Sequence, residues 1–372
     1  MYYRNTILPR LNYIPFFFTR VLLELINVFT FHKFRKYSNR NSLLCIESGI
    51  RGWELIEYKE LYNSAIEFFG NDRVEKVEII TSQDYISQVK NAIKLHKPTH
   101  YFYDARTGSQ NIFMGLMQSI RIAIIFQFNG IIPICLLTDC PMRTWRSQCG
   151  IVSAKRGLVL TLMSPKDIHS IFPHNRIIGP MTMPFSNKTS IMLDSLVANK
   201  KANIKPSVIF TGSLYEPRTS ILEAIKHGLE KYDLELDIKG RILGEKKASD
   251  EDYWLRLVNA TVVITTSNQI SSKDTDFAIL PHLIYRYIEV PASGSLLIAQ
   301  TVPSIERYFK PNEHFVSFDT PEDAVNKISY YMKNTEEREI ITKKGFIKAQ
   351  SIIKSNLYWV SIDLTLGKYS ML

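Results

Sequence analysis

The sequence is poor in cysteine and lacks the spacings that disulfide frameworks and zinc sites require. Four cysteines occur in 372 residues, with no C-x-x-C pair and no histidine at a zinc-finger spacing. This excludes a disulfide-stapled fold and favours a reducing cytoplasm. A thiol nucleophile with a nearby base is a remaining use of these residues, with Cys140, Cys149, Asp139 and His169 as its members, but no surrounding signature supports it.

The common catalytic fingerprints are absent as well. The chain contains no G-x-x-x-x-G-K-[ST], no G-x-G-x-x-G, no H-E-x-x-H and no G-x-S-x-G. P-loop kinases and ATPases, simple dinucleotide-binding enzymes, zinc proteases and serine hydrolases are therefore disfavoured. Tandem repeats and low-complexity tracts are also missing.

What is present is an alternation of short apolar runs with longer periodic segments, in a chain long enough for two domains. Such alternation is typical of α/β folds with parallel sheets. Helices are expected near 56–69, 83–95, 111–129, 217–231, 250–259, 283–292, 321–333 and 336–354. Buried strands are expected at 43–46, 77–80, 100–103, 131–137, 158–163, 208–211, 234–239, 261–266 and 295–299.

The domain boundaries follow from changes in this pattern. We expect a basic amphipathic segment over 1–40, a Rossmann-like domain over 41–185, a polar linker over 186–206, a second Rossmann-like domain over 207–355 and a C-terminal tail or helix over 356–372. In two sheets of this kind the ligand site is expected in a cleft between them, outside the carboxyl ends of the strands.

Positive charge is concentrated at the N-terminus. The formal net charge is +10, and residues 1–40 contribute seven basic residues against one acidic residue, Glu24. The apolar stretch 13–31 within this segment is interrupted by Arg20, Glu24 and Asn27, whose spacing places them on one face of a helix. Because these polar residues break the run, the helix is expected to lie on a membrane rather than to cross it.

The basic residues after this stretch would attract an anionic membrane surface. The alternative is a helix packed on the protein's own core with a solvated basic tail, and the sequence leaves both open. No cleavage site of a signal peptide follows the apolar run, so a cytoplasmic location is expected, peripheral on the inner face of the cell membrane in the first case.

One segment of the second domain carries recognisable chemistry, Tyr285 to Ala299. Arg286 and Glu289 stand three residues apart on one helical face, before a turn of small residues and a buried strand. A carboxylate can accept hydrogen bonds from both hydroxyls of a ribose, and an arginine can bind phosphate. The alternative is an ordinary surface ion pair between the two side chains.

These residues and their surroundings resemble the nucleotide-sugar-binding domain of GT-B glycosyltransferases, and most closely the group with the CgeB-type spore-maturation proteins. The resemblance runs over about 208–350, in the order 210–213 (Phe-Thr-Gly-Ser), 286–289 (Arg-Tyr-Ile-Glu), 292–294 (Ala-Ser-Gly), 303–306 (Pro-Ser-Ile-Glu), 308–313 (Tyr-Phe-Lys-Pro-Asn-Glu), 315–318 (Phe-Val-Ser-Phe) and 321–324 (Pro-Glu-Asp-Ala). It implies a GT-B architecture of two Rossmann-like domains facing a cleft.

The resemblance implies roles for several residues of the donor site. Glu289 would bind the ribose, and Arg286 would lie beside the diphosphate. The remaining donor-site residues implied in this way are Gly212, Ser213, Ser293 and Gly294. From its loop position, Arg241 or Lys273 is expected to be a second cation for the diphosphate. Many retaining relatives carry a second glutamate shortly before the ribose-binding one; here position 282 is His, which leaves the stereochemistry open.

The first domain offers candidates for catalysis and acceptor binding. Asp104 and Asp139 each follow a predicted strand, where a carboxylate could act as the catalytic base or merely cap a helix. Gly49 and Arg51 lie in a loop after the first strand, and with Arg106 they are expected to bind the acceptor or, alternatively, to be ordinary surface residues.

Together these observations predict a metal-independent glycosyltransferase without a cofactor. It would use a UDP- or GDP-linked sugar and a glycan or lipid-linked acceptor of cell-surface polysaccharide or glycoconjugate synthesis. No metal site is expected, because helix dipoles and cations can neutralise the departing diphosphate. The alternatives are a nucleotide-sugar epimerase of the same fold, a basic protein that binds nucleic acid or membrane, and a non-catalytic scaffold; nucleic-acid binding is not expected, since the charge lies in one apolar-flanked terminus.

Overall fold

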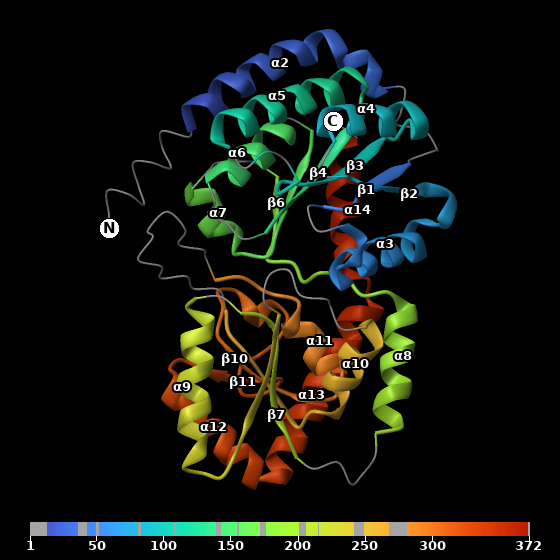
Figure 1. The fold of residues 1–372 in the computed structure, drawn as a ribbon. Helices are drawn as coiled ribbons and strands as arrows, with labels where there is room; N and C mark the ends of the chain where they lie inside the picture. The colour runs from blue at the N-terminus through green and yellow to red at the C-terminus, as the bar shows by residue number, and fades with distance from the viewer. Residues whose placement is uncertain are drawn as a thin grey trace. The chain divides into compact units, whose positions relative to one another are not determined.

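The computed structural model describes residues 13–35, 43–49, 52–80, 83–107, 109, 111–138, 143–154, 156–171, 176–200, 206–214, 216–241, 249–267 and 281–370. The chain divides into two compact units, each with its own sheet (Figure 1). Unit 1 comprises Met1–Pro184 with Tyr358–Leu372, and unit 2 comprises Phe185–Leu357.

Unit 1 contains a parallel sheet of six strands in the order β2-β1-β3-β4-β5-β6. Side chains of its central strands are buried on both faces, which explains why these strands appear in the sequence as continuous apolar runs. The strands are β1 (Leu44–Glu47), β2 (Val74–Val77), β3 (His100–Asp104), β4 (Ile132–Leu137), β5 (Leu158–Thr161) and β6 (Ile177–Ile178).

Helices connect these strands, and side-chain caps fix where several of them begin. Asp84 accepts a hydrogen bond from the backbone N–H of Ser87, and Asn111 caps the next helix in the same way. The helices of unit 1 are α2 (Tyr13–Arg35), α3 (Ile56–Phe69), α4 (Tyr85–His96), α5 (Ile112–Phe128), α6 (Arg143–Val152), α7 (Pro165–Ile171) and α14 (Leu357–Ser370), with short 3₁₀ turns η1 (Gly52–Glu54) and η2 (Asn71–Arg73).

The first and the last described helices, α2 and α14, both pack in unit 1. Helix α14 returns to it from unit 2, and its Trp359 donates a hydrogen bond of 2.9 Å to the buried Ser64 hydroxyl of α3. Helix α2 packs on α5 and α6 and forms an outer layer of the unit (Figure 1). Among the described residues, no helix is long and apolar enough to cross a membrane.

Unit 2 contains a parallel sheet of five strands in the order β11-β10-β9-β7-β8. The strands are β7 (Val208–Ser213), β8 (Leu236–Arg241), β9 (Val262–Thr265), β10 (Leu296–Gln300) and β11 (Val316–Phe318). The helices are α8 (Asn187–Ala198), α9 (Arg218–Glu230), α10 (Asp250–Asn259), α11 (Arg286–Ala292), α12 (Pro321–Lys333) and α13 (Thr335–Lys354), with a 3₁₀ turn η3 (Ile305–Arg307).

The segment that we predicted as a polar linker, 186–206, is helical over much of its length. Ser186 caps α8 by accepting from the N–H of Thr189, and Leu193 is fully buried. Gln350 of α13 bonds to Ser190 and Asp194 of α8. The prediction of a linker here was wrong because small polar residues resemble a loop in sequence, whereas a buried glutamine satisfies them in the fold.

Both units are doubly wound α/β sheets, as the alternating pattern predicts. In unit 1 the chain moves outward from β1 to β2 and then to the other side at β3, and in unit 2 it moves from β7 to β8 and then to β9. Each sheet therefore has a topological switch point, between β1 and β3 and between β7 and β9. Doubly wound sheets bind ligands at the carboxyl ends of the strands that flank this point.

Candidate functional site

The switch point of unit 2 opens because β7 and β9 separate toward their carboxyl ends. Their register pairs only Val208 with Val262 and Ile209 with Val263, whereas β7 pairs with β8 along all six of its residues. The last residues of β7 are Gly212 and Ser213, and both were predicted to face the donor diphosphate. The strand therefore places Gly212 and Ser213 beside the switch point of unit 2.

Gly212 is required by its conformation and by an arginine that lies against it. Its φ is +147°, and a Cβ atom there would lie 2.3 Å from Nη2 of Arg286. Arg286 begins α11, and its Nε donates a hydrogen bond of 2.7 Å to the carbonyl oxygen of Thr211. Its guanidinium lies 5.8 Å from the centre of the Phe210 ring. The structure thus fixes the predicted diphosphate arginine against the end of β7.

A second arginine, which the sequence did not single out, reaches the same strand end. Arg218 begins α9 and is only 5% exposed. Its Nη1 donates to the carbonyl oxygen of Ser213 at 2.8 Å, and its Nε donates to Oγ1 of Thr266 at 3.0 Å. Because Ser213 ends β7 and Thr266 follows β9, Arg218 bridges the switch point. A basic residue at the first turn of the helix after a glycine-containing strand end was the signal that could have identified it.

Two buried hydroxyl groups lie at the carboxyl end of β9. Thr265 and Ser267 are 0% and 3% exposed, and their side-chain oxygens have no hydrogen-bond partner among the described residues. Buried polar groups are normally hydrogen-bonded, so hydroxyls of this kind are suited to a polar ligand.

Glu289 lies one turn after Arg286 on α11, as its spacing predicts, and is 2% exposed. Its carboxylate accepts a hydrogen bond from the hydroxyl of Tyr253 on α10. A buried carboxylate held by a tyrosine is oriented in advance, which is suited to binding sugar hydroxyls. Tyr253 was not anticipated from the sequence.

Other predicted donor-site residues have structural contacts of their own. The Ser293 hydroxyl donates to the carbonyl oxygen of Val290 and is fully buried, and Gly294 has a φ of +68° where α11 ends. Arg241 ends β8 opposite Ser213 in the sheet register, and nothing is described of its side chain. Lys273 lies outside the described residues.

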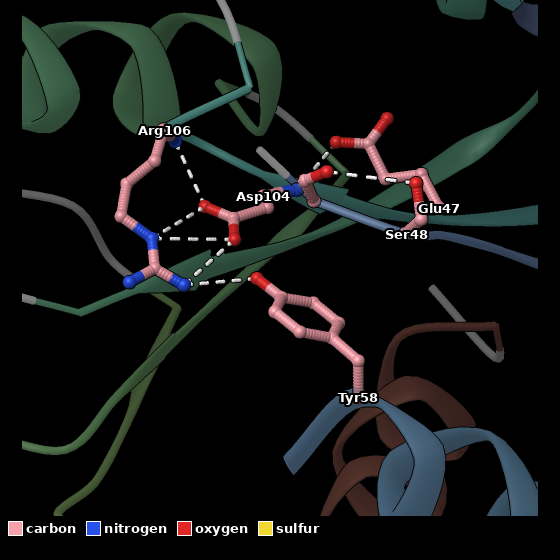
Figure 2. A network of polar contacts seen from close by, with 6 residues as sticks. Glu47, Ser48, Tyr58, Asp104 and Arg106 are labelled. Atoms are coloured by element: carbon pink, nitrogen blue, oxygen red, sulfur yellow. Dashed lines mark hydrogen bonds and ion pairs between the residues drawn. The ribbon is translucent and has the colours of Figure 1, made fainter. Parts of the chain in front are cut away.

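The switch point of unit 1 holds the predicted Asp104 and Arg106 in one network (Figure 2), and the predicted Gly49 lies against it. Asp104 is fully buried, and its carboxylate accepts from Nη2 of Arg106 at 2.9 Å and from the Arg106 backbone N–H at 2.8 Å. Arg106 also donates to the Tyr58 hydroxyl at 2.9 Å. Gly49 has a φ of +64°, and a Cβ there would lie 2.5 Å from that hydroxyl and 2.9 Å from Oδ2 of Asp104.

Glu47, at the end of β1, is a buried acid that was not among the candidate residues from the sequence. It accepts hydrogen bonds from the Tyr85 hydroxyl at 2.7 Å, from the Tyr101 hydroxyl at 3.3 Å and from the backbone N–H of Asp104 at 2.9 Å. Complete burial raises the pKa of Glu47 to about 8. Through its bonds to Tyr101 and to the backbone of Asp104, this carboxyl links the end of β1 to β3.

Other sequence candidates of unit 1 are not brought into this network. Asp139, Arg51 and Cys140 lie outside the described residues. Cys149 is fully buried, whereas His169 is exposed, so these two do not form an accessible thiol and base pair. No group of three or more His, Cys, Asp and Glu side chains able to hold a metal occurs in the described part of the chain.

Two Asp-x-Asp triplets, a pattern associated with metal-bound nucleotide sugars, do occur in the sequence. The first, at 250–252, forms the first turn of α10, where Ser249 caps the helix through the N–H of Asp252. The second, at 274–276, lies outside the described residues. The first triplet therefore already has a role as a helix start.

Comparison with known proteins shows which proteins have a similar sequence in unit 2 and a similar fold over the whole chain. A family model described as glycosyl transferase-like matches residues 220–358, most of unit 2. The chain is similar to HepE of Anabaena in complex with UDP and glucose, with a TM-score of 0.55 and 11% identity over 88% of this chain and 100% of that chain. No curated protein matches.

Other solved glycosyltransferases give the same result. Sucrose-phosphate synthase of Thermosynechococcus elongatus gives a TM-score of 0.55 at 11% identity, covering 88% of this chain and 98% of that chain. A glycosyltransferase of Rickettsia africae ESF-5 gives 0.52 at 9% identity, covering 88% and 98%. The fold is therefore that of GT-B glycosyltransferases, which confirms the predicted fold class, and the matching family model, described as glycosyl transferase-like, covers most of unit 2.

Proposed function

We propose that the protein transfers a sugar from a nucleoside-diphosphate sugar, bound by unit 2, to a hydroxyl group of an acceptor bound by unit 1. The observation that carries the proposal is the convergence of Arg218, Arg286 and Glu289 at the switch point of unit 2. Two guanidinium groups are suited to a diphosphate, and a buried carboxylate one turn away is suited to a ribose. UDP is the first choice of nucleotide, because a similar fold binds it, and GDP is the second.

In the proposed reaction the bond between the anomeric carbon and the diphosphate oxygen breaks, and its electron pair leaves with the diphosphate. Arg218 and Arg286 would stabilise the negative charge that develops on this leaving group. The acceptor oxygen forms the new bond to the anomeric carbon and gives its proton to a base. Because two fixed cations supply positive charge, the proposed reaction needs no metal, and we expect activity to persist in the presence of a chelator.

The two predicted catalytic carboxylates receive different roles in this proposal. Asp104 is buried and paired with Arg106, so we assign it to holding that arginine in place for the acceptor. Asp139 is then the proposed proton acceptor. Gly49 lies against the same pair, and with Arg51 it belongs to the proposed acceptor site.

The finer parts of the proposal concern the pathway. The resemblance to CgeB-type enzymes and the basic N-terminal segment support an acceptor that is a glycan or a lipid-linked sugar of the cell surface. They also support a cytoplasmic enzyme that works on the inner face of the membrane. The donor's sugar and the stereochemistry are to be read from the reaction product.

The test is to incubate the protein with UDP-glucose, UDP-galactose and GDP-mannose, with and without a lipid extract of the host cell, and to measure nucleotide release and product. We expect release of one nucleoside diphosphate, stimulated by the extract and lost in Asp139→Asn. Conversion of the donor's sugar into its epimer without an acceptor would instead identify an epimerase. Absence of nucleotide release under all conditions would contradict the proposal.

A further inference from the structure

Helix α2 exposes most of its described apolar side chains and buries two threonines. Seven large apolar residues of α2 are between 43% and 78% exposed: Phe17, Phe18, Val21, Leu22, Leu25, Val28 and Phe29. Their spacing of one, three and four residues places them within one continuous face of the helix. We call these seven residues the outer face of α2.

The opposite face of α2 fixes the helix to unit 1. Thr19, Leu23 and Thr30 are buried, and α2 packs against α5 and α6. Gln127 of α5 donates a hydrogen bond of 2.6 Å to the backbone carbonyl oxygen of Leu23. The outer face is therefore presented by a helix that is already docked on α5 and α6, and this helix forms an outer layer of unit 1 (Figure 1).

The arrangement reverses the usual order of an amphipathic helix on a protein surface, in which the apolar face is buried. A contiguous exposed apolar face of this kind marks a surface for another apolar partner. The earlier alternatives for this segment, a membrane-bound helix or a helix packed on the protein's core, are thus not exclusive, because opposite faces of α2 can serve both.

We propose that the outer face of α2 docks unit 1 on an anionic lipid bilayer, with its phenylalanine, leucine and valine side chains inserted among the acyl chains. Charge complementarity selects this partner. The 46 residues before Glu47 contain seven basic residues and one acidic residue, and each basic residue near an anionic leaflet strengthens binding. A second copy of this chain carries the same excess of positive charge in this segment, which opposes its association with the first copy.

This inference deepens the proposed function and rests on it only for the nature of the acceptor, since a docked unit 1 would meet lipid-linked sugars at the bilayer surface. The outer face and the donor site lie in different units, so each can be tested while the other is intact.

The experiment is co-sedimentation of the full chain with vesicles of equal parts phosphatidylcholine and phosphatidylglycerol, and with vesicles of phosphatidylcholine alone. The test variant is Phe18→Ser/Leu25→Ser/Phe29→Ser. The control variant replaces three exposed apolar residues of other helices, Leu95→Ser/Ile191→Ser/Ile347→Ser, which are 76%, 69% and 57% exposed. Unchanged melting temperature and UDP binding show that each variant is folded and that the donor site is independent.

We expect the wild type and the control variant to bind the anionic vesicles, and the partition coefficient of the test variant to fall at least about tenfold. Binding to neutral vesicles should be weaker than binding to anionic ones. The proposal is overturned if the wild type does not bind, or if both triple variants bind equally. It is also overturned if the wild type is a dimer by light scattering and the test variant a monomer, since the face would then join two copies.

Discussion

The two switch points each combine a glycine of positive φ with an arginine, but the arginine binds a different kind of group in each unit. Each has a positive-φ glycine shortly after or at the end of its first strand, Gly49 in unit 1 and Gly212 in unit 2, and each glycine faces an arginine or its partners. In unit 1 Arg106 binds a buried carboxylate, whereas in unit 2 Arg286 binds a backbone carbonyl oxygen. The contact in unit 1 is an ion pair at the end of β3, whereas the contact in unit 2 orients a guanidinium group at the end of β7.

The largest effect on stability is expected at the unit 1 pair. Arg106→Ala would leave the fully buried Asp104 carboxylate without its main partner and should lower the free energy of unfolding by about 3 kcal/mol. Urea unfolding measures it, with Arg73→Ala as an exposed arginine control. Recovery of part of the loss by adding Asp104→Asn would support the pairing, whereas equal stability of wild type and Arg106→Ala would show that the two switch points do not differ as described.

A comparable effect is expected on activity in unit 2. Arg286→Ala and Arg218→Ala should each lower kcat/KM for the nucleotide sugar by about 10²–10³, because each removes a cation from the developing diphosphate charge. Arg338→Ala is the matched control, since this partly buried arginine also donates to backbone carbonyl oxygens but lies on α13. If loss of Arg218 leaves kcat/KM unchanged, the bridge across the switch point is structural.

The stability of unit 1 is expected to depend on pH through the buried Glu47. The pKa of Glu47 is raised to about 8 in the folded protein from 4.5, so folding holds a proton that the unfolded chain releases. Stability should therefore fall as the pH rises from about 4.5 to about 8, by at most about 1.4 kcal/mol per pH unit, and then level off. Glu47→Gln should remove this slope, and the exposed Glu78→Gln should keep it. Identical pH profiles of wild type and Glu47→Gln would contradict a protonated buried Glu47.

The smallest effect on stability is expected for alanine substitutions at two neighbouring glycines of unit 1. Gly49 and Gly52 both have positive φ, at +64° and +69°, but only at Gly49 would a Cβ meet other atoms within 4 Å. Gly52→Ala should cost about 1–2 kcal/mol for the backbone conformation alone. Gly49→Ala should cost more, because it also displaces Tyr58 and Asp104. Equal melting temperatures for the two variants would show that the network of Figure 2 tolerates displacement.

Much of the fold could be predicted because apolar runs and caps are local. The strand ending at Leu137 and the helix 321–333 begin and end in the structure close to the expected residues. The strand predicted at 77–80 lies three residues earlier in the structure, where β2 spans Val74–Val77. The exposed Lys76 interrupts the apolar run by which the strand could have been recognised in the sequence. Helix α14 was foreseen only as a tail or helix, because its packing on Ser64 depends on residues almost 300 positions away.

The site was predictable only in part for the same reason. Arg286 and Glu289 share one helix, so their spacing showed that they lie together. Arg218 and Tyr253 reach the site from other helices, and their contacts with Ser213 and Glu289 depend on the sheet order. The ion pair that occupies Asp104 is local in sequence, but its burial is not.

The most direct test of the proposed donor site is calorimetric titration of the wild type, Glu289→Gln and Arg106→Gln with UDP, and of the wild type with GDP. A hydrogen bond to a charged group contributes about 1.5–3 kcal/mol, so the variant should bind at least about tenfold more weakly. Arg106→Gln, which changes unit 1, should bind UDP as the wild type does. UDP binding by the wild type that is lost in Glu289→Gln alone is the predicted result. Equal affinity of all three proteins, or no binding of UDP or GDP by the wild type, would contradict a nucleotide-sugar site at the switch point of unit 2.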